Sequence, residues 1–290
     1  MKIGITADCS SCLEYAPFNH NIHITRTTIH FDNETLIDGI DITADQFYLR
    51  LESSDIIPST SAPTLGQLYA RVEELKAIGC TDIIHFPISY NLSTYGENWE
   101  AIKDELFTDI NFYVFNSNTA CIMQGYNAKY AEILASKGYN VEQIFNECAK
   151  VRANTNAFFV VDDIKYLVKN GRLNTITGFI GNLTKIKPIL ELNNEGRIVT
   201  FDKVRTHRRA VEQMIETILA RSQHAKKVLY LVQHSNRYEE AVELAEKIKK
   251  LANNIHRVEI STITPTVGAH IGSGLLGIGR IILDDLNEEI

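Results

Sequence analysis

Short apolar runs alternate with longer amphipathic stretches along almost the whole chain. This alternation is typical of strands that are joined by crossover helices, and therefore of parallel sheets. In the first half of the chain the apolar runs predict strands at residues 2–7, 22–31, 82–88 and 111–115. In the second half they predict strands at 157–161, 228–233, 257–261 and 277–283, and a hairpin formed by 186–192 and 197–201. The pattern indicates an α/β protein.

Helix-start signals precede two of the amphipathic stretches. Thr43-Ala44-Asp45-Gln46 and Thr64-Leu65-Gly66-Gln67 are capping boxes, in which a Thr hydroxyl and a Gln amide satisfy free N–H groups. Gly79 is positioned to end the second of these helices. Further helices are expected at 97–106, 175–182 and 206–221. Two amphipathic helices separated near Gly138 should follow the strand at 111–115, and two more helices should end at Gly171 and at Leu251.

The regular alternation changes around residues 154–156, after which the chain includes a hairpin. We therefore expect two α/β domains, residues 1–155 and 156–290. The first should be a Rossmann-like layered fold with a parallel sheet, and the second a smaller mixed α/β domain. No Pro-rich or Ser-rich linker marks the boundary, so we expect the two domains to pack closely.

Composition and charge argue against several classes of function. The chain has 29 Lys and Arg against 36 Asp and Glu, a net charge of −7, which favours neither nucleic acid nor an anionic membrane. At most a transient contact with a membrane surface is expected. No apolar stretch approaches the roughly 20 residues of a membrane span, and the first residues lack the apolar core of a signal peptide. The five cysteines cannot all pair, which fits a reduced, cytoplasmic setting.

Two short motifs match functional signatures but lack the required context. Gly272-Ser-Gly274-Leu-Leu-Gly277 is followed by a predicted strand and not by the helix of a dinucleotide site, so close backbone approach is the simpler reading. Cys9-Ser-Ser-Cys12 lacks the second ligand pair of a structural zinc site, and nothing around it indicates thiol redox chemistry. We expect no metal and no cofactor.

Three segments that we expect to be loops are rich in small hydroxyl residues and lie beside predicted strands, at 58–63, 89–95 and 261–270. In doubly wound sheets, ligands bind at the carboxyl ends of strands, and the second segment follows such an end. Neutral hydroxyls with one histidine, His270, suit a carboxylate or phosphate oxygen better than a sugar or a metal. Each cluster alone is more typical of turns and helix caps, but the ligand-site reading stays open beside that one.

Seven motifs, in order along essentially the whole chain, give it a resemblance to the DegV family, which includes the fatty-acid-binding subunits of bacterial fatty acid kinase. They are Asp8-Cys9-Ser10, Thr60-Ser61-Ala62-Pro63, Ser89-x-x-Leu92-Ser93-Thr94-Tyr95, Asn170-Gly171-Arg172-Leu173, Lys187-Pro188-Ile189-Leu190 with Gly196, Arg205 before a helix, and Thr264-Pro265-x-Val267-Gly268-x-His270-x-Gly272-x-Gly274. The chain departs from the family pattern at Ala7 and Cys9, at Ser273, which replaces a usual Pro, and after Ser93, where a Gly is missing.

The resemblance implies a carrier that is not itself an enzyme, with a long-chain fatty acid bound between the two domains. Its carboxylate would be held by hydroxyl groups and a histidine, from Thr60, Ser61, Ser93, Thr94 and His270. The acyl chain would lie in a tunnel formed by Ile176, Phe179, Ile180, Leu183 and Ile189, although each of these also suits an ordinary core. A separate kinase subunit would supply phosphoryl transfer, and Arg172 and Arg205 would face the phosphate or that kinase, or else be helix-end or surface cations.

Two other functions remain open. Ser93 and His270 could form part of a hydrolase or acyltransferase, which would also need a residue that orients the histidine and an oxyanion hole. Alternatively, the chain binds some other small acid.

Overall fold

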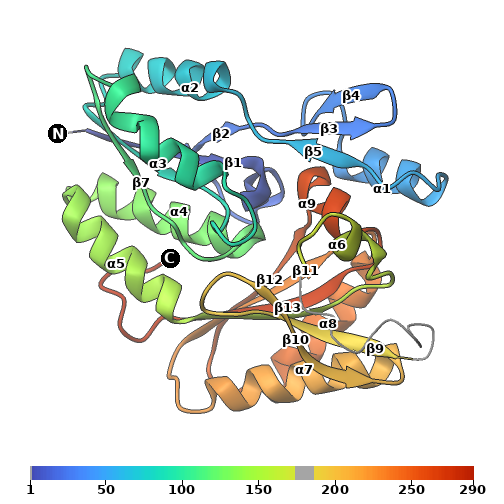
Figure 1. Ribbon diagram of the computed structural model, residues 1–290. Helices are drawn as coiled ribbons and strands as arrows, with labels where there is room; N and C mark the ends of the chain where they lie inside the picture. The colour runs from blue at the N-terminus through green and yellow to red at the C-terminus, as the bar shows by residue number, and fades with distance from the viewer. Residues whose placement is uncertain (1, 174–185) are drawn as a thin grey trace.

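The computed structural model describes residues 2–173 and 186–290. Within these residues the strands form a four-stranded parallel sheet, a six-stranded mixed sheet and a small three-stranded sheet. The expected α/β class, with a parallel sheet in the first half and a mixed sheet in the second, is confirmed (Figure 1).

The parallel sheet is built from the first half of the chain, in the order β2-β1-β6-β7. Its strands are β1 (Ile3–Asp8), β2 (His23–Thr25), β6 (Asp82–Phe86) and β7 (Asn111–Val114). One face packs against α2 (Leu65–Ala77) and α3 (Tyr95–Leu106), and the other against α4 (Cys121–Ser136). Both expected capping boxes form, at the start of α2 and of α1 (Ala44–Glu52).

The predicted strand at 22–31 is wrong as a single element. It is divided into β2, which belongs to the parallel sheet, and β3 (Thr28–Phe31), which pairs with β4 (Glu34–Ile37) and β5 (Ser59–Ser61). The chain leaves the parallel sheet where the Thr27 N–H donates to the Cys9 thiol, 3.3 Å away. The three-stranded sheet and α1 share a small core. The β-branched residues at 22–31 therefore contribute strands to two different sheets.

The six-stranded sheet has the order β10-β9-β8-β13-β11-β12. Its strands are β8 (Thr155–Val160), β9 (Lys187–Leu192), β10 (Ile198–Val204), β11 (Val228–His234), β12 (Ile255–Thr262) and β13 (Leu276–Ile282). The predicted hairpin is the antiparallel pair β9–β10, and β11 and β12 are parallel strands joined by α8 (Tyr238–Leu251). Together with α7 (His207–Ser222), α8 covers one face.

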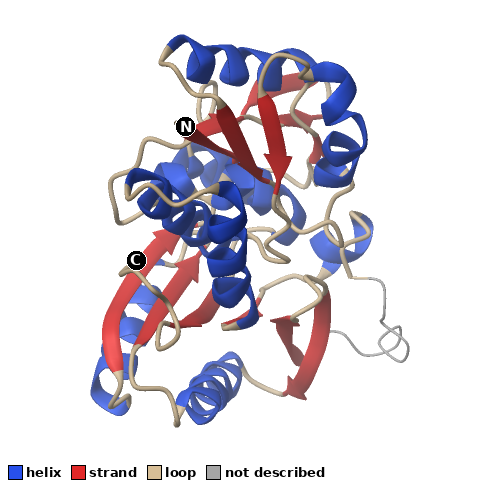
Figure 2. Cartoon of the chain, turned by 90° about the vertical axis from the view of Figure 1, so that its left-hand side faces the viewer, coloured by secondary structure: helices blue, strands red, loops and turns tan. Residues whose placement is uncertain are grey.

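Helix α4 lies between the two large sheets (Figure 1), and the view from the side in Figure 2 shows helices in this position. Its core includes β1 residues on one side and Leu229, Leu231 and Ile281 of the six-stranded sheet on the other. Residues Ile122–Ala128 are all buried, so the expectation of an amphipathic helix is wrong here, because α4 has apolar neighbours on both sides. Helix α5 (Val141–Ala153) is amphipathic as predicted, since its buried residues lie on one face.

Two short helices of the second half carry motif residues, α6 (Lys165–Lys169) and α9 (Pro265–Ile271). The segment at 261–270, expected as a loop, is thus partly helical, with Pro265 in the first turn, where its missing N–H costs nothing. Helix α9 packs on the small sheet of the first half, alongside α1. The sheets divide near residue 155, while the domain boundary itself stays a prediction. The predicted helix at 175–182 lies outside the described residues.

Candidate functional site

A cavity of about 170 Å³ lies between the loops of the parallel sheet and the six-stranded sheet. Asp8, Ser10 and Ile88, which come at or just after the ends of β1 and β6, line one wall. Ala157, Phe159, Leu192 and Gly277 of the six-stranded sheet are among the residues of the opposite wall. For comparison, an apolar protein cavity of about 150 Å³ already stays dry and binds small hydrocarbons. This space therefore suits an apolar ligand.

Thr60 and His270 meet at the polar end of the cavity, although 210 positions separate them in the sequence. Their side chains form a hydrogen bond, with 2.8 Å between Thr60 Oγ1 and His270 Nε2. Thr60 is delivered by β5, and His270 by the last turn of α9. The buried Asp38 carboxylate accepts the N–H of Thr266 at 2.8 Å and so fixes the first turn of α9. The structure thus brings the first and third hydroxyl-rich segments together.

His270 is held neutral at neutral pH. Burial, together with the positive charge of Arg172, lowers the pKa of its imidazole to about 4. Its Nδ1 atom is buried and has no hydrogen-bond partner among the described residues. A neutral imidazole carries one N–H donor, whose position depends on which atom of the Thr60 pair donates. An anionic ligand beside it would favour the protonated ring.

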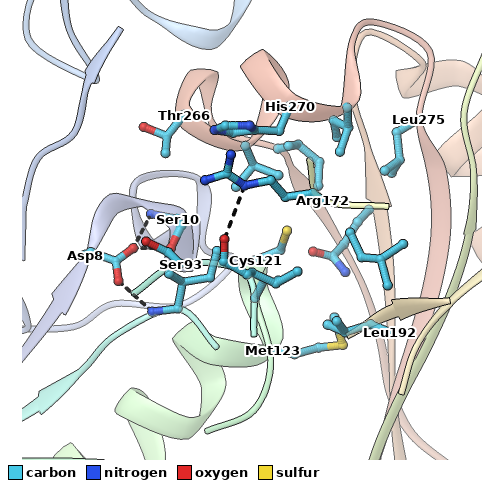
Figure 3. Close-up of a pocket in the computed structure, with 18 of the residues that line it drawn as sticks. Asp8, Ser10, Ser93, Cys121, Met123, Arg172, Leu192, Thr266, His270 and Leu275 are labelled. Atoms are coloured by element: carbon cyan, nitrogen blue, oxygen red, sulfur yellow. Dashed lines mark hydrogen bonds between the residues drawn. The ribbon is translucent and has the colours of Figure 1, made fainter. Parts of the chain in front are cut away.

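Arg172 reaches the same end of the cavity from the turn after α6, as Figure 3 shows. Gly171 takes the left-handed conformation, φ 70°, that closes the helix, and Asn170 ties the turn to α9 through the Ala269 carbonyl at 3.1 Å. The Arg172 Nε donates to the Leu92 carbonyl at 3.3 Å. Over residues 2–173 and 186–290 no carboxylate pairs with this guanidinium, and burial lowers its pKa without removing its charge. Arg172 therefore gives the cavity a positive polar end.

Ser93 lines the cavity from the loop that follows β6. This loop is tied to the β9–β10 turn by Ser89, whose hydroxyl donates to the Gly196 carbonyl at 2.9 Å. A β-carbon on Gly196 would lie 2.0 Å from Ser89 Oγ, so only glycine permits this approach. Ser93 Oγ accepts the N–H of Tyr95, the first residue of α3, at 3.3 Å.

Asp8 and Ser10 form a second polar wall, which the sequence singled out only as a family motif. The Asp8 carboxylate accepts the N–H groups of Ser10 at 2.9 Å and Ile88 at 2.7 Å, and side-chain donors from Ser10 and Gln124. Burial raises its pKa, while these donors act in the opposite direction. The carboxylate is fully engaged and serves to join the ends of β1 and β6.

Four of the predicted site residues do not line the cavity. Ser61 is exposed on β5, where its hydroxyl is 2.8 Å from His30 Nε2, because successive strand residues point to opposite faces. Thr94 is exposed at the start of α3, and Arg205 is exposed between β10 and α7. Ile189 faces α7 on the far side of the six-stranded sheet. Ile176, Phe179, Ile180 and Leu183 lie outside the described residues.

The apolar part of the cavity uses residues that sequence reasoning missed. Figure 3 shows Met123 and Leu192 on the side of the pocket away from Thr266 and His270. Other apolar lining residues are Cys121, Phe159, Ile198, Val267, Ile271 and Leu275. They belong to core segments whose hydrophobicity has no distinguishing period, so only the fold separates lining from packing.

The glycine-rich segment after α9 approaches other side chains closely, as the simpler reading predicted. Gly272 and Gly274 have φ of 79° and 90°, and a β-carbon on Gly274 would lie 2.1 Å from Asp162.

All five cysteines are free, and burial strongly raises the pKa of Cys9. Within the described ranges no group of three or more His, Cys, Asp or Glu residues could hold a metal ion. No helix there is long and apolar enough to cross a membrane.

Comparisons with known proteins agree with this architecture. A protein named DegV from Bacillus subtilis is 32% identical over 285 residues, covering 96% of this chain and 98% of the relative. The crystal structure of DegV, a fatty acid binding protein from the same organism, has a TM-score of 0.86 at 30% identity, over 97% of this chain and 99% of that one.

A fatty acid binding DegV family protein from Streptococcus agalactiae has a TM-score of 0.86 at 28% identity, over 97% of this chain and 99% of that chain. The family model described as an uncharacterised protein of the DegV family matches residues 2–282. The resemblance first carried by seven short motifs is confirmed, and the chain belongs to the DegV family.

Proposed function

We propose that this chain binds one long-chain fatty acid in the cavity. The carboxylate lies at the end formed by Thr60, Ser93, Arg172 and His270, and the acyl chain extends toward Met123 and Leu192. The observation that carries the proposal is the asymmetry of the cavity, which joins a mainly apolar interior to one end where Arg172 supplies a positive charge beside hydroxyl groups. The relatives named as fatty acid binding proteins support it.

The two parts of a fatty acid have different energetic needs, and the two ends of the cavity meet one each. Each methylene removed from water contributes about 0.8 kcal/mol, so a long acyl chain gains on the order of 10 kcal/mol before ordering costs. A buried carboxylate without partners would cost several kcal/mol of this gain. The Arg172 guanidinium and the hydroxyls of Thr60 and Ser93 would supply charge-assisted hydrogen bonds in compensation.

The proposal extends to presentation of the carboxylate to a separate kinase subunit. Thr60, Ser93 and Arg172 are only partly buried, so this end of the cavity is partly open to the surface of the protein. A carboxylate oxygen held there by hydroxyl groups remains able to attack a phosphoryl donor. The kinase is inferred from the family resemblance, and we propose that this chain contributes substrate binding without catalysis.

The geometry gives less support to a Ser93–His270 hydrolase. His270 Nε2 is bonded to Thr60, while Ser93 Oγ accepts the Tyr95 N–H. The other ring nitrogen of His270 has no carboxylate to orient it among the described residues. The serine, base and orienting acid of a triad are therefore not assembled.

Solvent extraction and mass spectrometry of the protein purified from cells would test the proposal. We expect one equivalent of a long-chain fatty acid, which exchanges with added fatty acid after delipidation. A variant with the cavity filled, Ala157→Phe, should purify without lipid. Repeated absence of any fatty acid, with no binding by delipidated protein in calorimetry, would contradict the proposal.

Addition of a bacterial fatty acid kinase subunit with ATP and magnesium tests the second step. Acyl-phosphate should form only when both proteins are present. Turnover of an acyl ester or acyl-CoA by the isolated chain would instead favour the hydrolase or acyltransferase.

A further inference from the structure

Gln233 places a buried amide in the wall of the cavity. It is the next-to-last residue of β11 and is 5% exposed, in a strand whose other residues are also buried. Its Oε1 accepts the backbone N–H of Ile122, at the start of α4, at 3.2 Å. Because this partner can only donate, the bond determines which way the amide points. The NH2 group is therefore the free end of the side chain.

The Gln233 NH2 group has no acceptor within residues 2–173 and 186–290. Lining residues beside its two partners are apolar: Cys121 precedes Ile122, and Phe159 and Leu275 lie next to Gly277, which pairs with Gln233 across the sheet. Two N–H donors at such a position are unfavourable unless a ligand or a water accepts from them. An interior that served only unsubstituted hydrocarbon would be better lined by Leu or Met.

The residue opposite Gln233 leaves space around the amide. Gln233 pairs with Gly277 of β13 in the antiparallel register, and both residues line the cavity. A β-carbon on Gly277 would lie 3.0 Å from the Phe159 β-carbon, so a side chain there would crowd this wall. The missing side chain lets a ligand atom come close to the amide.

We propose that the Gln233 amide recognises an oxygen atom on the acyl chain, so that the ligands this chain prefers include long-chain fatty acids with a hydroxyl or keto group away from the carboxylate. This inference rests on the proposed fatty-acid function and deepens it. The carboxylate itself is expected elsewhere, because the cationic Arg172 and the hydroxyl groups lie at the His270 end. A keto or hydroxyl oxygen accepts from Nε2 and so satisfies a donor that faces the cavity and that a plain chain leaves unpaired.

The test is calorimetric titration of the delipidated full chain with stearic acid and with a positional series of monohydroxystearic and monoketostearic acids. At the favoured position, the wild-type chain should bind the oxygenated acid about tenfold more tightly than stearic acid, the change expected for one hydrogen bond. Gln233→Leu should remove this preference and leave stearic acid affinity equal or higher. Gln223→Leu makes the same chemical change at an exposed residue and should retain the preference.

A second measurement needs no mutation. The side-chain amide resonances of Gln233, followed by NMR in glutamine-labelled protein, should shift more with the favoured oxygenated acid than with stearic acid. Stearic acid binding without any positional preference in the wild-type chain would overturn the inference and leave the proposed function intact. Equal weakening of all acids by Gln233→Leu would also overturn it, because Gln233 would then hold the carboxylate. Failure of every acid, stearic acid included, would overturn both.

Discussion

The two ends of the cavity are built in different ways. The polar end combines side chains that lie far apart in sequence, Thr60, Ser93, Arg172 and His270, each at a strand edge, a loop or a helix end. The apolar end is formed by the face of the six-stranded sheet and the buried helix α4. The polar end is thus assembled from short elements and loops that are only partly buried, whereas the apolar end is part of the protein core.

On the proposed function, this difference would let one site both hold a long ligand and expose its reactive group. The core-like end supplies non-directional affinity that scales with buried area. The polar end contributes few but directional hydrogen bonds, so it determines the orientation of the ligand more than the total affinity. Substitutions at the two ends should therefore differ in size and in kind.

The largest effect is expected from filling the apolar end. Ala157 of β8 is buried and lines the cavity. Ala157→Phe should displace several methylenes of the acyl chain and weaken fatty acid binding at least about a hundredfold. Calorimetry with stearic acid measures the loss, and a thermal melt verifies the fold. Ala153→Phe, at an exposed position, is the control, and near-normal binding by Ala157→Phe would place the acyl chain elsewhere.

The second prediction concerns pH and the polar end. The folded pKa of His270 is lowered to about 4, against 6.5 for an unperturbed histidine, so between these values the unfolded chain binds a proton that the folded chain does not. The free energy of unfolding should therefore fall as the pH drops from about 6.5 to about 4, by on the order of 3 kcal/mol for this residue.

Urea unfolding of wild type and His270→Gln across this pH range isolates the His270 contribution, because other buried groups are common to both. His224→Gln, at an exposed position, should behave as wild type. Bound fatty acid should reduce the loss, since its carboxylate favours the protonated ring. A pH dependence that is the same in wild type and His270→Gln would mean that the histidine is not desolvated.

Single bonds at the polar end should have moderate effects. Ser93→Ala and Thr60→Val should each weaken fatty acid binding by about one to two orders of magnitude, the value of a charge-assisted hydrogen bond of roughly 1.5–3 kcal/mol. Thr60→Val and His270→Ala should be non-additive, because their side chains lie 2.8 Å apart. Calorimetric titration of the single and double variants measures this coupling. Unchanged affinity in all single variants would put the carboxylate at another site.

The smallest effect is expected one residue along the same strand. Ser61 is exposed and bonded to His30, on the face of β5 opposite to Thr60. Ser61→Ala should change fatty acid affinity less than about twofold, because it contacts neither end of the cavity. The same titration that detects Thr60→Val serves here. A loss as large as that of Thr60→Val would show that the strand face is assigned wrongly.

The sequence predicted the polar end better than the apolar end, for physical reasons. Hydroxyl clusters beside strands are visible as composition, so Thr60, Ser93 and His270 could be named. The face of a three-residue strand cannot be read from its composition, however, and Ser61 was therefore included with Thr60. A hydroxyl-rich loop was expected over residues 89–95, but α3 begins at Tyr95 and Thr94 is exposed at its start.

The lining of the apolar end could not be read from hydrophobicity. Strand β9 buries residues of both faces, so Ile189 and Leu192 were indistinguishable by pattern although they face opposite sides of the sheet. Helix α4 is buried nearly all round and gave no sign that Met123 reaches a cavity. Gln233 lies in a strand whose residues are all buried, so the sequence pattern gave no indication that it lines a cavity.

The orientation of the ligand is the central claim, and a crystal structure with a fatty acid brominated at its terminal carbon tests it most directly. The anomalous signal of bromine locates the end of the chain independently of the electron density for the carboxylate. We expect bromine beside Met123 and Leu192, and the carboxylate within hydrogen-bond distance of Thr60, Ser93 or His270. Bromine beside His270, or a ligand bound outside the cavity, would contradict the account.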